Sequence, residues 1–507
     1  MSRFLSRRGL LSSAAAVGAA GFLTPRLGFG QFADPHSSAA QAALDTSAGP
    51  CTVPQLVVER RTIEVNGKAA SVFGIAGPNK SSELILDADQ RFLFELVNRS
   101  GEPTIVHWHG QTPPTDQDGV VETGYEGPIE NGESHVYDFA TRPGTHWMHS
   151  HFGLQEQALL AAPMIIRTAE DLALDAQEVT VFLHDFSFKE PSELLRSLTG
   201  DGVMSHEREA PEKISRPAQA SLTNRSASNP TSLALCGDVV LNDIDYDAYL
   251  ANDRTLDDPF VVRTERGGRV RLRLINGASG TSFWIDLGAR RGEVIAADGN
   301  PVKPVSGSRF PLAQGQRLDI LLDVPADTPV PVLAQREGER ELTGIVLASS
   351  GARVAKIDKL AKEKALPIDL SLEEKLEAVT PLPARKPNTR REISLAGRMK
   401  PFTWTMNERT WVDRKDIRVQ HGQRVIMELR NDSLMAHAMH LHGHCFQVIG
   451  LEDKPMAGAV RDTVLVPALG TVTIAFDADN VGRWLFHCHN LWHMAAGMMT
   501  QLVYKYA

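Results

Sequence analysis

Four non-overlapping pairs of histidines, each pair separated by a single residue, constrain this chain more than any other feature. They fall at positions 107/109, 149/151, 440/442 and 487/489, and the last pair encloses Cys488. With 17 histidines in 507 residues, random placement gives fewer than one such pair, so the clustering needs a chemical cause. On a β-strand, residues i and i+2 point to the same face, so each pair can offer two imidazoles to a common centre. The pairs therefore predict metal binding on β-strands.

The residues around Cys488 narrow the choice of metal. Imidazole suits copper, zinc, iron and nickel, whereas two histidines, a cysteine and a weak axial methionine make a blue-copper electron-transfer site. Cys488 is followed by His493 and Met498, which supply two of these partners. A zinc cluster, or histidines that merely pack in a core, are the alternative interpretations. Four paired sets together with a flanked cysteine favour copper.

Length and charge limit the class of protein. The 507 residues are enough for about three domains of the usual size, and a hydrophobic content of 42% is ordinary for a packed protein. The net charge of −9 argues against nucleic-acid binding and gives no basic face for anionic membranes. No apolar run has the length that spanning a bilayer requires, so stable membrane insertion is not expected.

The N-terminus resembles an export signal. Arg7 and Arg8 precede an uncharged apolar stretch that reaches Leu23, which indicates a twin-arginine signal peptide over residues 1–30, whereas a buried first helix is the weaker alternative. The signal predicts recognition by the twin-arginine export machinery and a periplasmic location. Four cysteines occur, and if Cys488 is a ligand the other three cannot all pair. Cys51 with Cys236 is one candidate disulfide, and Cys445 is expected to be a small buried residue.

A repeated strand pattern organises the rest of the chain. Residues 91–98, 269–276 and 424–431 each alternate inward apolar and outward residues and end on asparagine, as expected of a half-buried strand closed by a turn. Their wide separation favours three β-domains over short solenoid repeats. We therefore predict an all-β protein of three consecutive Greek-key β-sandwiches. The predicted boundaries are 45–170, 171–350 and 388–507, with a linker over 351–387.

The repeat places the histidine pairs in equivalent positions. His107 follows Asn98 by nine residues, and His440 follows Asn431 by nine residues. The same step in the middle repeat reaches Ile285, so the middle domain is expected to lack ligands and to serve as a spacer. Two four-histidine halves facing each other across a domain interface could hold a metal cluster that neither domain could hold alone. Cys488, between two of these histidines, would join a single copper to that cluster.

At this point the chain resembles the multicopper oxidases, close to their bacterial laccase-like and cuprous-oxidase branch. The resemblance covers essentially the whole chain after the signal and rests on four motifs: His107-Trp-His-Gly110, His149-Ser-His151, His437-Ala-Met-His-Leu-His-Gly443 and His487-Cys-His-Asn-Leu-Trp-His-Met-Ala-Ala-Gly-Met498. Lesser matches are Ala297-Asp-Gly-Asn-Pro301, Gly315-Gln-Arg-Leu-Asp319 and Arg461-Asp-Thr-Val-Leu-Val-Pro467.

The resemblance implies three cupredoxin domains and four copper ions per chain. A type 1 copper would bind His437, Cys488 and His493, with Met498 as its axial ligand. A type 2 copper would bind His107 and His440. A binuclear type 3 pair would bind the remaining six histidines of the four pairs: His109, His149, His151, His442, His487 and His489.

The resemblance also implies an activity. Phenolic or aromatic amine donors would give up electrons singly at the type 1 copper, and dioxygen would be reduced to water at the trinuclear cluster. Met435, Met439 and Met494 flank type 1 ligands, and thioethers suit Cu(I), so a cuprous or other metal oxidase acting in copper tolerance is an alternative. A copper-poor structural relative in the periplasm is a third. Methionines beside a buried site are more often packing.

Reduction of dioxygen consumes protons, so a carboxylate near the cluster is expected to relay them. Asp118 matches the acid that follows the first motif in the family. Leu491 and Met494 stand where relatives carry an acid in the last motif, so Asp118 is expected to carry the greater share.

The remaining histidines fall outside the ligand pattern. His146 and His444 are expected to support the site by hydrogen bonding or packing. Residues 199–232 form a polar insertion that is expected to be a surface loop. The other five histidines are expected on the surface or in loops: His36, His135, His184, His206 and His421.

Overall fold

A computed structural model of the protein describes residues 53–200 and 240–505. Three predictions concern segments outside these residues: the signal peptide over 1–30, the Cys51–Cys236 pair, and the 199–232 insertion beyond its first two residues. The same holds for His36 and His206. These points stay predictions.

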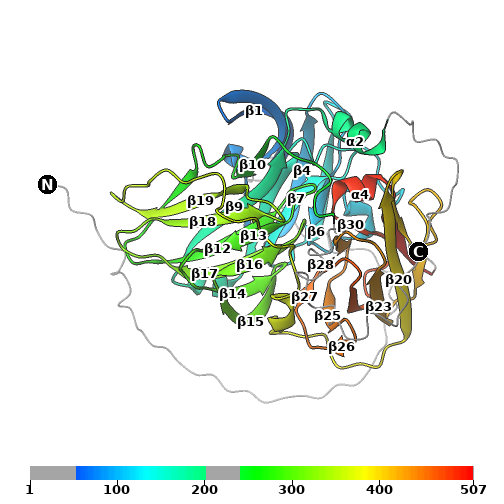
Figure 1. The fold of residues 1–507 in the computed structure, drawn as a ribbon. Coiled ribbons are helices and arrows are strands. Elements are labelled where there is room, and N and C mark those ends of the chain that lie inside the picture. The colour runs from blue at the N-terminus through cyan, green and yellow to red at the C-terminus, as the bar shows by residue number, and fades with distance from the viewer. Residues whose placement is uncertain (1–52, 201–239, 506–507) are drawn as a thin grey trace, which may run out of the picture. The chain divides into compact units, whose positions relative to one another are not determined.

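The described strands form six sheets, which make three consecutive β-sandwiches (Figure 1). In the first sandwich, one sheet has the order β2-β1-β4-β6 and the other the order β3-β8-β7-β5. The strands are β1 (Gln55–Val65), β2 (Lys68–Ala76), β3 (Leu84–Asp87), β4 (Arg91–Arg99), β5 (Val106–His109), β6 (Ser134–Ala140), β7 (Gly144–Ser150) and β8 (Ala161–Arg167).

The middle sandwich, green in Figure 1, has sheets of the order β10-β9-β12-β17-β14-β15 and β11-β19-β18-β13-β16. Its strands are β9 (Gln177–Phe186), β10 (Ala248–Ala251), β11 (Phe260–Thr264), β12 (Arg269–Asn276), β13 (Phe283–Asp286), β14 (Gly292–Ala297), β15 (Asn300–Gly307), β16 (Arg309–Leu312), β17 (Arg317–Asp323), β18 (Val330–Arg336) and β19 (Leu342–Ser349).

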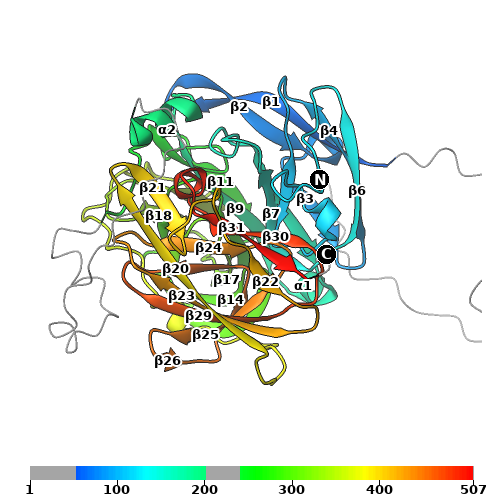
Figure 2. The ribbon, with the colours of Figure 1, turned by 90° about the vertical axis from the view of Figure 1, so that its right-hand side faces the viewer.

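The third sandwich, yellow to red, has sheets of the order β21-β20-β23-β29-β25-β26 and β22-β31-β30-β24-β28, and β27 pairs with β25 (Figure 2). Its strands are β20 (Thr389–Met399), β21 (Phe402–Met406), β22 (Ile417–Val419), β23 (Arg424–Asn431), β24 (His437–Leu441), β25 (Phe446–Leu451), β26 (Lys454–Pro455), β27 (Val460–Arg461), β28 (Thr463–Val466), β29 (Thr471–Asp477), β30 (Arg483–Cys488) and β31 (Met499–Tyr504).

One topology recurs in all three sandwiches. The predicted repeat strands are β4, β12 and β23, and each pairs in parallel with the first strand of its own sandwich, which is β1, β9 or β20. The opposite sheet of each sandwich holds a second parallel pair, β3 with β8, β11 with β19, or β22 with β31. All other strand pairs are antiparallel, so each sandwich has the mixed Greek-key arrangement of a cupredoxin. The predicted fold class is confirmed.

A buried asparagine closes each repeat strand, which explains why the repeats end on this residue. Asn98, Asn276 and Asn431 are each 0% exposed. In every case the side-chain amide donates to a carbonyl of the following turn, and its oxygen accepts from the backbone N–H two residues later. The amide thus replaces strand hydrogen bonds where the chain leaves the sheet, and it fixes the start of the next strand.

The strand β12 differs from the predicted half-buried pattern, because it is buried on both faces. Its outward residues Arg271 and Arg273 are 6% and 1% exposed. Both contact the carboxylate of Asp319, and Asp171 and Glu178 complete the ion pairs. The alternating sequence pattern predicted that these arginines face solvent. It could not show that the charged face is covered, because the acids that pair with the arginines are distant in sequence.

Within residues 53–200 and 240–505, helices are few and short. They are α1 (Ala169–Ala173), α2 (Pro191–Thr199) and α4 (Leu491–Ala495), with 3-10 turns η1 (Pro78–Lys80), η2 (Thr115–Gln117) and η4 (Glu373–Lys375). Among the described residues, no helix combines the length and apolar character that crossing a membrane requires.

The predicted linker over 351–387 packs along the protein. Leu372 and Leu376 join the core of the middle sandwich, and Ile368 packs with Trp284 and residues of the third sandwich. The segment therefore fixes the third sandwich against the middle one instead of acting as a loose tether.

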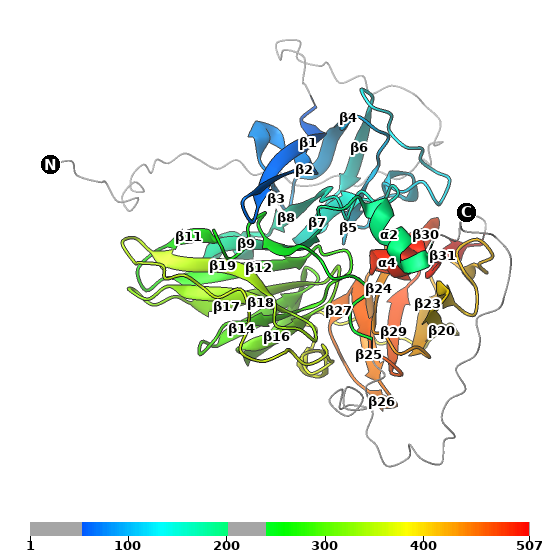
Figure 3. The same ribbon diagram turned by 45° about the horizontal axis from the view of Figure 1, so that its top comes forward.

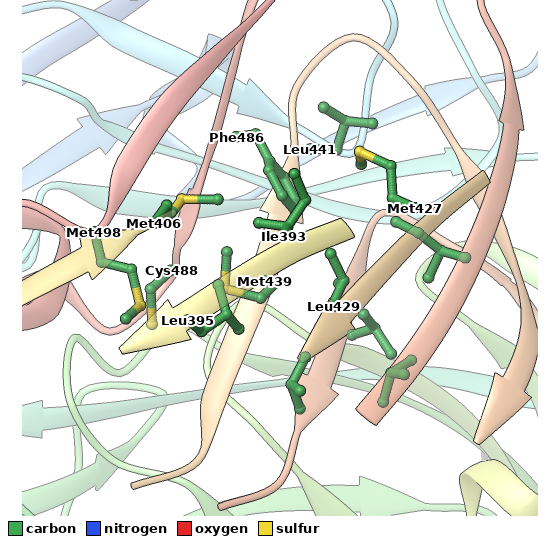
Figure 4. Packing of buried hydrophobic residues seen from close by; sticks show 14 of the residues in the cluster. Ile393, Leu395, Met406, Met427, Leu429, Met439, Leu441, Phe486, Cys488 and Met498 are labelled. Carbon is green, nitrogen blue, oxygen red and sulfur yellow. The ribbon is translucent and has the colours of Figure 1, made fainter. Parts of the chain in front are cut away.

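Each sandwich has a core between its two sheets. The core of the third sandwich is rich in sulfur: Met406, Met427, Met439, Met498 and Cys488 lie among leucine, isoleucine and phenylalanine side chains (Figure 4). The predicted ligands Cys488 and Met498 are thus embedded in an apolar wall that excludes water.

Candidate metal centre

Two antiparallel strand pairs present the histidines. In the first sandwich, β5 and β7 pair so that His107 lies opposite His149. In the third, β24 and β30 pair so that His440 lies opposite His487. The second histidine of each pair follows two residues later, at or just beyond the end of its strand. The register therefore brings each half of the predicted ligand set together before the sandwiches meet.

The two halves meet across the interface between the first and third sandwiches, where β5 and β7 lie near β24 and α4 (Figure 3). The rings of His107 and His442 stack with centroids 3.8 Å apart, and so do those of His109 and His440. Each of the eight side chains is at most 4% exposed. We call these residues the histidine cluster: His107, His109, His149, His151, His440, His442, His487 and His489.

Within the histidine cluster, ligand atoms gather into three groups whose members lie within 4.8 Å of one another. The groups are His109, His149 and His489; His151, His442 and His487; and His107, His440 and His109. The first two hold the six histidines predicted for a type 3 pair, and the third holds the two predicted for a type 2 ion. The structure brings all eight together, and the ion that each would hold stays a prediction.

The donor atoms fit a metal. Nε2 of His107, His149, His151 and His440 is buried and has no hydrogen-bond partner. The other ring nitrogen of His107 donates to the carbonyl of Asp118 at 2.8 Å, and that of His440 donates to the carbonyl of Asp462 at 3.0 Å. An unpaired buried polar atom is costly, and metal-bound histidines usually donate through the opposite nitrogen. The donor atoms are therefore arranged as metal-bound histidines require.

Burial also favours the protonation state that a metal needs. Desolvation is the largest cause that lowers the pKa of six rings of the histidine cluster: His109, His149, His440, His442, His487 and His489. Neighbouring imidazoles lower these pKa values further, and only neutral imidazole binds metal. In His151, burial is opposed by the carboxylate of Glu122, which leaves the pKa raised.

The structure places Asp118 at the histidine cluster. Its side chain is fully buried, and its Oδ2 accepts a hydrogen bond from His442 Nδ1 at 2.9 Å. Oδ1 lies 3.3 Å from His107 Nδ1. Asp118 therefore touches one histidine of each half, and its role as a proton relay stays a prediction.

Sequence reasoning missed two further acids at the histidine cluster. Glu156 Oε2 lies 2.9 Å from His149 Nδ1, and Glu122 Oε2 lies 3.3 Å from His151 Nδ1. Burial raises the pKa of Glu156 well above its usual range, and Asp185 raises it further. Both acids lie on loops beside β5 and β7, where no fixed spacing marks them, so the sequence alone carried no signal for them.

A third acid, Asp462, sits within one of the lesser motifs. Its Oδ1 lies 3.2 Å from His109 Nε2. Although burial opposes its ionisation, the paired guanidinium of Arg317 holds the pKa of Asp462 well below its usual range. This carboxylate is therefore charged at the edge of the cluster.

The residues predicted for a type 1 copper form a separate group, which we call the blue-copper group: His437, Cys488 and His493. Cys488 Sγ lies 3.7 Å from His437 Nδ1 and 3.6 Å from His493 Nδ1. The opposite nitrogens are engaged, His437 Nε2 with Ser433 Oγ at 2.8 Å and His493 Nε2 with Asp243 Oδ2 at 3.1 Å. Although burial lowers it, Asp243 raises the pKa of His493 to about 9.

Local chain geometry brings Met498 to this group. Asn490 caps α4 by accepting from the N–H groups of Trp492 and His493, which starts the helix directly after the ligand strand. Gly497 then turns the chain with φ +118°, where a Cβ would lie 2.8 Å from the carbonyl oxygen of Trp404. The carbonyl of Met498 accepts from the N–H of Cys488 at 3.1 Å, and Figure 4 shows the two sulfur atoms turned toward each other.

Cys488 connects the two sites through the backbone. Its side chain belongs to the blue-copper group, while its neighbours His487 and His489 belong to different groups of the histidine cluster. The connection between the sites is therefore one residue long in either direction.

The nine-residue step needs a correction in the middle sandwich. Ile285 is 0% exposed and faces the core, whereas His107 and His440 face the interface. The interface-facing residue of β13 is Trp284, which packs against Ala438 of the third sandwich. A one-residue difference in the preceding turn reverses the face. Among the described residues, none of the middle sandwich belongs to a candidate metal group.

The other histidines divide by environment. As predicted, His444 and His146 form hydrogen bonds, His444 with the carbonyl of His442 and Tyr504, and His146 with the carbonyl of Pro143. His135 and His421 are exposed as expected.

One expectation was wrong. His184 is 4% exposed in β9, where Nδ1 donates to the carbonyl of Gly277 at 3.0 Å. A partner carbonyl distant in sequence satisfies this ring, and no local pattern announces it. Cys445 is a free thiol in a partly exposed residue beyond β24, and burial raises the pKa of the thiol group itself.

Three cupredoxin-like sandwiches with a histidine cluster and a blue-copper group define a copper-dependent oxidoreductase. Comparison with known families is consistent with this. Three family models, each described as multicopper oxidase, match residues 57–171, 206–331 and 384–506. The chain belongs to the multicopper oxidase family, and this membership implies that it binds copper.

The relatives agree in family and fold. The chain is 28% identical to multicopper oxidase MmcO of Mycobacterium tuberculosis, over 97% of this chain and 92% of the relative. It is 26% identical to copper resistance protein A of Escherichia coli, over 90% and 92%. The crystal structure of Fet3p, a multicopper oxidase that functions in iron import, gives a TM-score of 0.71 at 17% identity, over 89% of this chain and 90% of that one. This last likeness concerns the fold alone.

Proposed function

We propose that the protein is a laccase-like oxidase that takes electrons singly from phenolic or aromatic amine donors and reduces dioxygen to water. The observation that carries this proposal is Cys488, whose side chain lies in the blue-copper group and whose two neighbours lie in the histidine cluster. One copper ion bound at the blue-copper group would accept electrons singly, and three copper ions bound at the histidine cluster would support four-electron reduction of dioxygen.

The donor would approach at His493. Its Nε2 faces Asp243, whose Oδ2 also accepts from the side chain of Asn490 at 2.9 Å. The side chain of Asp243 is 0% exposed and its Oδ1 has no hydrogen-bond partner, so a proton lost by a phenol with its electron would be relayed inward to this oxygen. The neighbouring Asp245 and Tyr246 reach the surface, Asp245 exposed and Tyr246 partly so. This acidic edge would favour donors that release a proton on oxidation.

On the oxygen side, Asp118 is the proposed proton carrier. It contacts His107 and His442, one from each half of the histidine cluster. Leu491 and Met494 have no titratable group, so neither can take the place of the acid expected there. The acids Glu122 and Glu156 contact other rings of the cluster, Glu122 the ring of His151 and Glu156 the ring of His149.

Oxidation of Cu(I) in copper tolerance is the second candidate, because one relative is named copper resistance protein A. The methionines give it little support. Met435 and Met439 are 4% and 0% exposed and belong to the core of the third sandwich, which leaves only Met494 partly accessible. A single accessible thioether is a poor site for a metal substrate.

Expression with copper followed by metal quantification and oxygen uptake tests the proposal. We expect blue colour, about four coppers per chain, and faster oxygen uptake with a phenol than with Cu(I). A chain with no blue colour would be the copper-poor relative, and faster uptake with Cu(I) would establish the second candidate.

Asp243→Asn separates the donor side from the rest. We expect kcat/KM for a phenol to fall by about tenfold or more, while the rate with ferrocyanide, which releases no proton, changes little. Equal losses with both donors would contradict the role proposed for Asp243.

A further inference from the structure

The middle sandwich gives no ligand, yet one of its arginines lies against the histidine cluster. Arg317 begins β17, and its side chain is 0% exposed. We propose that Arg317 is a positioning residue for the histidine cluster, which fixes the orientation of His109 and His440 through Asp462. This inference rests on the proposed function, and it assigns the middle sandwich a part in building the metal site.

Every donor of the Arg317 guanidinium is used. Nε donates to the carbonyl of Thr145 at 3.1 Å, and Nη1 donates to the carbonyl of Gly315 at 3.0 Å. Nη1 and Nη2 also donate to the two oxygens of Asp462 at 2.7 and 2.5 Å. The last N–H points to His146 Nδ1 at 3.5 Å. A guanidinium has five donors in one rigid plane, so this set leaves it no freedom to rotate.

The partners of Arg317 come from all three sandwiches. Thr145 and His146 belong to β7 of the first, Gly315 precedes β17 of the middle one, and Asp462 lies between β27 and β28 of the third. The ligand strand β5 belongs to the first sandwich, and the ligand strand β24 belongs to the third. A residue bound to all three is therefore placed to set the distance between the two halves of the histidine cluster.

Asp462 transmits this position to one ring of each half. Its Oδ1 lies 3.2 Å from His109 Nε2, and its backbone carbonyl accepts from His440 Nδ1 at 3.0 Å. In His109, Nε2 therefore contacts Asp462, and Nδ1 faces the cluster at 3.2 Å from His489 Nε2. His440 spends Nδ1 and turns the unpaired Nε2 inward. Asp462 thus selects a different nitrogen in each ring, which requires that the carboxylate and its backbone be held still.

Two neighbours show how closely this site is packed. Asp298 accepts from the N–H of Arg317 at 2.9 Å and from that of Thr463 at 3.2 Å, so it links β17 to the strand that follows Asp462. A Cβ on Gly110, which follows the first histidine pair with φ +90°, would lie 2.5 Å from Arg317 Nη2. The backbone of the ligand motif and the guanidinium therefore fit together with no space between them.

A purely structural role would look like that of Arg273. This arginine is 1% exposed, donates to Thr145 Oγ1 at 2.9 Å and pairs with Asp319, so it also joins the first and middle sandwiches. It contacts no member of the histidine cluster. Arg273→Met is therefore the matched control for Arg317→Met, since both remove a buried cation from the same interface.

The experiment compares copper per chain with the blue absorption of the Cys488 centre. In Arg317→Met we expect the blue band to remain and the copper of the histidine cluster to be bound about 10- to 100-fold more weakly in competition with a chelator. Arg317→Lys keeps the charge without the paired hydrogen bonds, so its copper affinity at the histidine cluster is expected to lie between those of the wild type and Arg317→Met. Arg273→Met should keep the copper-to-blue ratio of the wild type. A wild-type ratio in Arg317→Met, or an equal loss in Arg273→Met, overturns the proposal.

Metal-free crystal structures give a second readout, which does not depend on the proposed function. In Arg317→Lys and Arg317→Met, the His109 and His440 rings should leave the positions that Asp462 sets. Unchanged rings in the variants overturn the proposal even if the wild type binds copper. If the rings are displaced in the variants but the wild type binds no copper, the positioning role is upheld and the oxidase function is refuted.

Discussion

Asn431 connects the repeated strand pattern to the blue-copper group, which makes it a sharp site for a test. Its side-chain nitrogen donates to the carbonyls of Met435 and Pro467 at 2.7 and 2.9 Å. Its oxygen accepts from Ser433 N–H at 2.9 Å and from Ser433 Oγ at 2.8 Å. Ser433 Oγ in turn lies 2.8 Å from His437 Nε2. The same residue thus holds the turn and orients a ligand.

Asn431→Ala removes about four hydrogen bonds at about 1 kcal/mol each, so the third sandwich should lose about 4 kcal/mol of stability. Asn276, its counterpart in the middle sandwich, makes three such bonds. Asn276→Ala should therefore cost about 3 kcal/mol. At about 3 °C per kcal/mol, each substitution should lower the melting temperature of its sandwich by about 10 °C.

Calorimetry of the metal-free proteins and the absorption spectrum after copper loading separate the two effects. Both variants should melt early, but only Asn431→Ala should shift or weaken the blue band, because only its turn reaches a predicted copper ligand. Ser433→Ala should give the spectral change with a smaller loss of stability. If Asn276→Ala altered the blue band as much as Asn431→Ala, or if Asn431→Ala melted with the wild type, the reasoning would be refuted.

Three further predictions follow from single side chains. Cys488→Ser should abolish the blue colour and lower the copper content by about one ion, because Cys488 Sγ contacts only the blue-copper group; a loss of all copper would contradict the separation of the two sites. Asp118→Asn should slow reoxidation of the fully reduced protein by about tenfold or more, and reoxidation at the wild-type rate would remove Asp118 from the proton path. Burial raises the pKa of Glu337 from an unfolded value of about 4.5 to about 8. The protonated side chain therefore stabilises the fold fully below about pH 4.5, and this stability is lost as pH rises from about 4.5 through about 8. Glu337→Gln should therefore gain on the wild type by about 1.4 kcal/mol per pH unit over that window, as measured by melting temperature at several pH values, and a constant difference would contradict a buried neutral acid.

The fold could be predicted because its signals are local and repeated. The strands that end on Asn98, Asn276 and Asn431 carry both the alternation and the asparagine that the turn needs. Two of the histidine pairs, 107/109 and 440/442, could be predicted to occupy equivalent positions for the same reason, since each begins nine residues after such an asparagine. Neither inference required knowledge of contacts distant in sequence.

The supporting residues could not be predicted in this way. Glu122, Glu156 and Asp243 reach their histidines from loops, and only the packing of the sandwiches decides which ring each one meets. Asp462 and Arg317 stood within recognisable motifs, but the motifs gave no sign that the two would pair across sandwiches. The predicted ligand histidines could be found from strand periodicity, whereas the residues that orient these histidines are determined by tertiary structure.

The middle sandwich shows why a repeat must be tested against side-chain direction. Counting nine residues from its asparagine reached Ile285, which faces the core, while the interface-facing position holds Trp284. A difference of one residue in a turn is invisible to composition but reverses every side chain of the following strand. The strand β13 has no histidine, and the middle sandwich uses its interface differently: Trp284 packs against the third sandwich, and Arg317 binds Asp462. The sandwich without ligands is placed to hold together the two that have them.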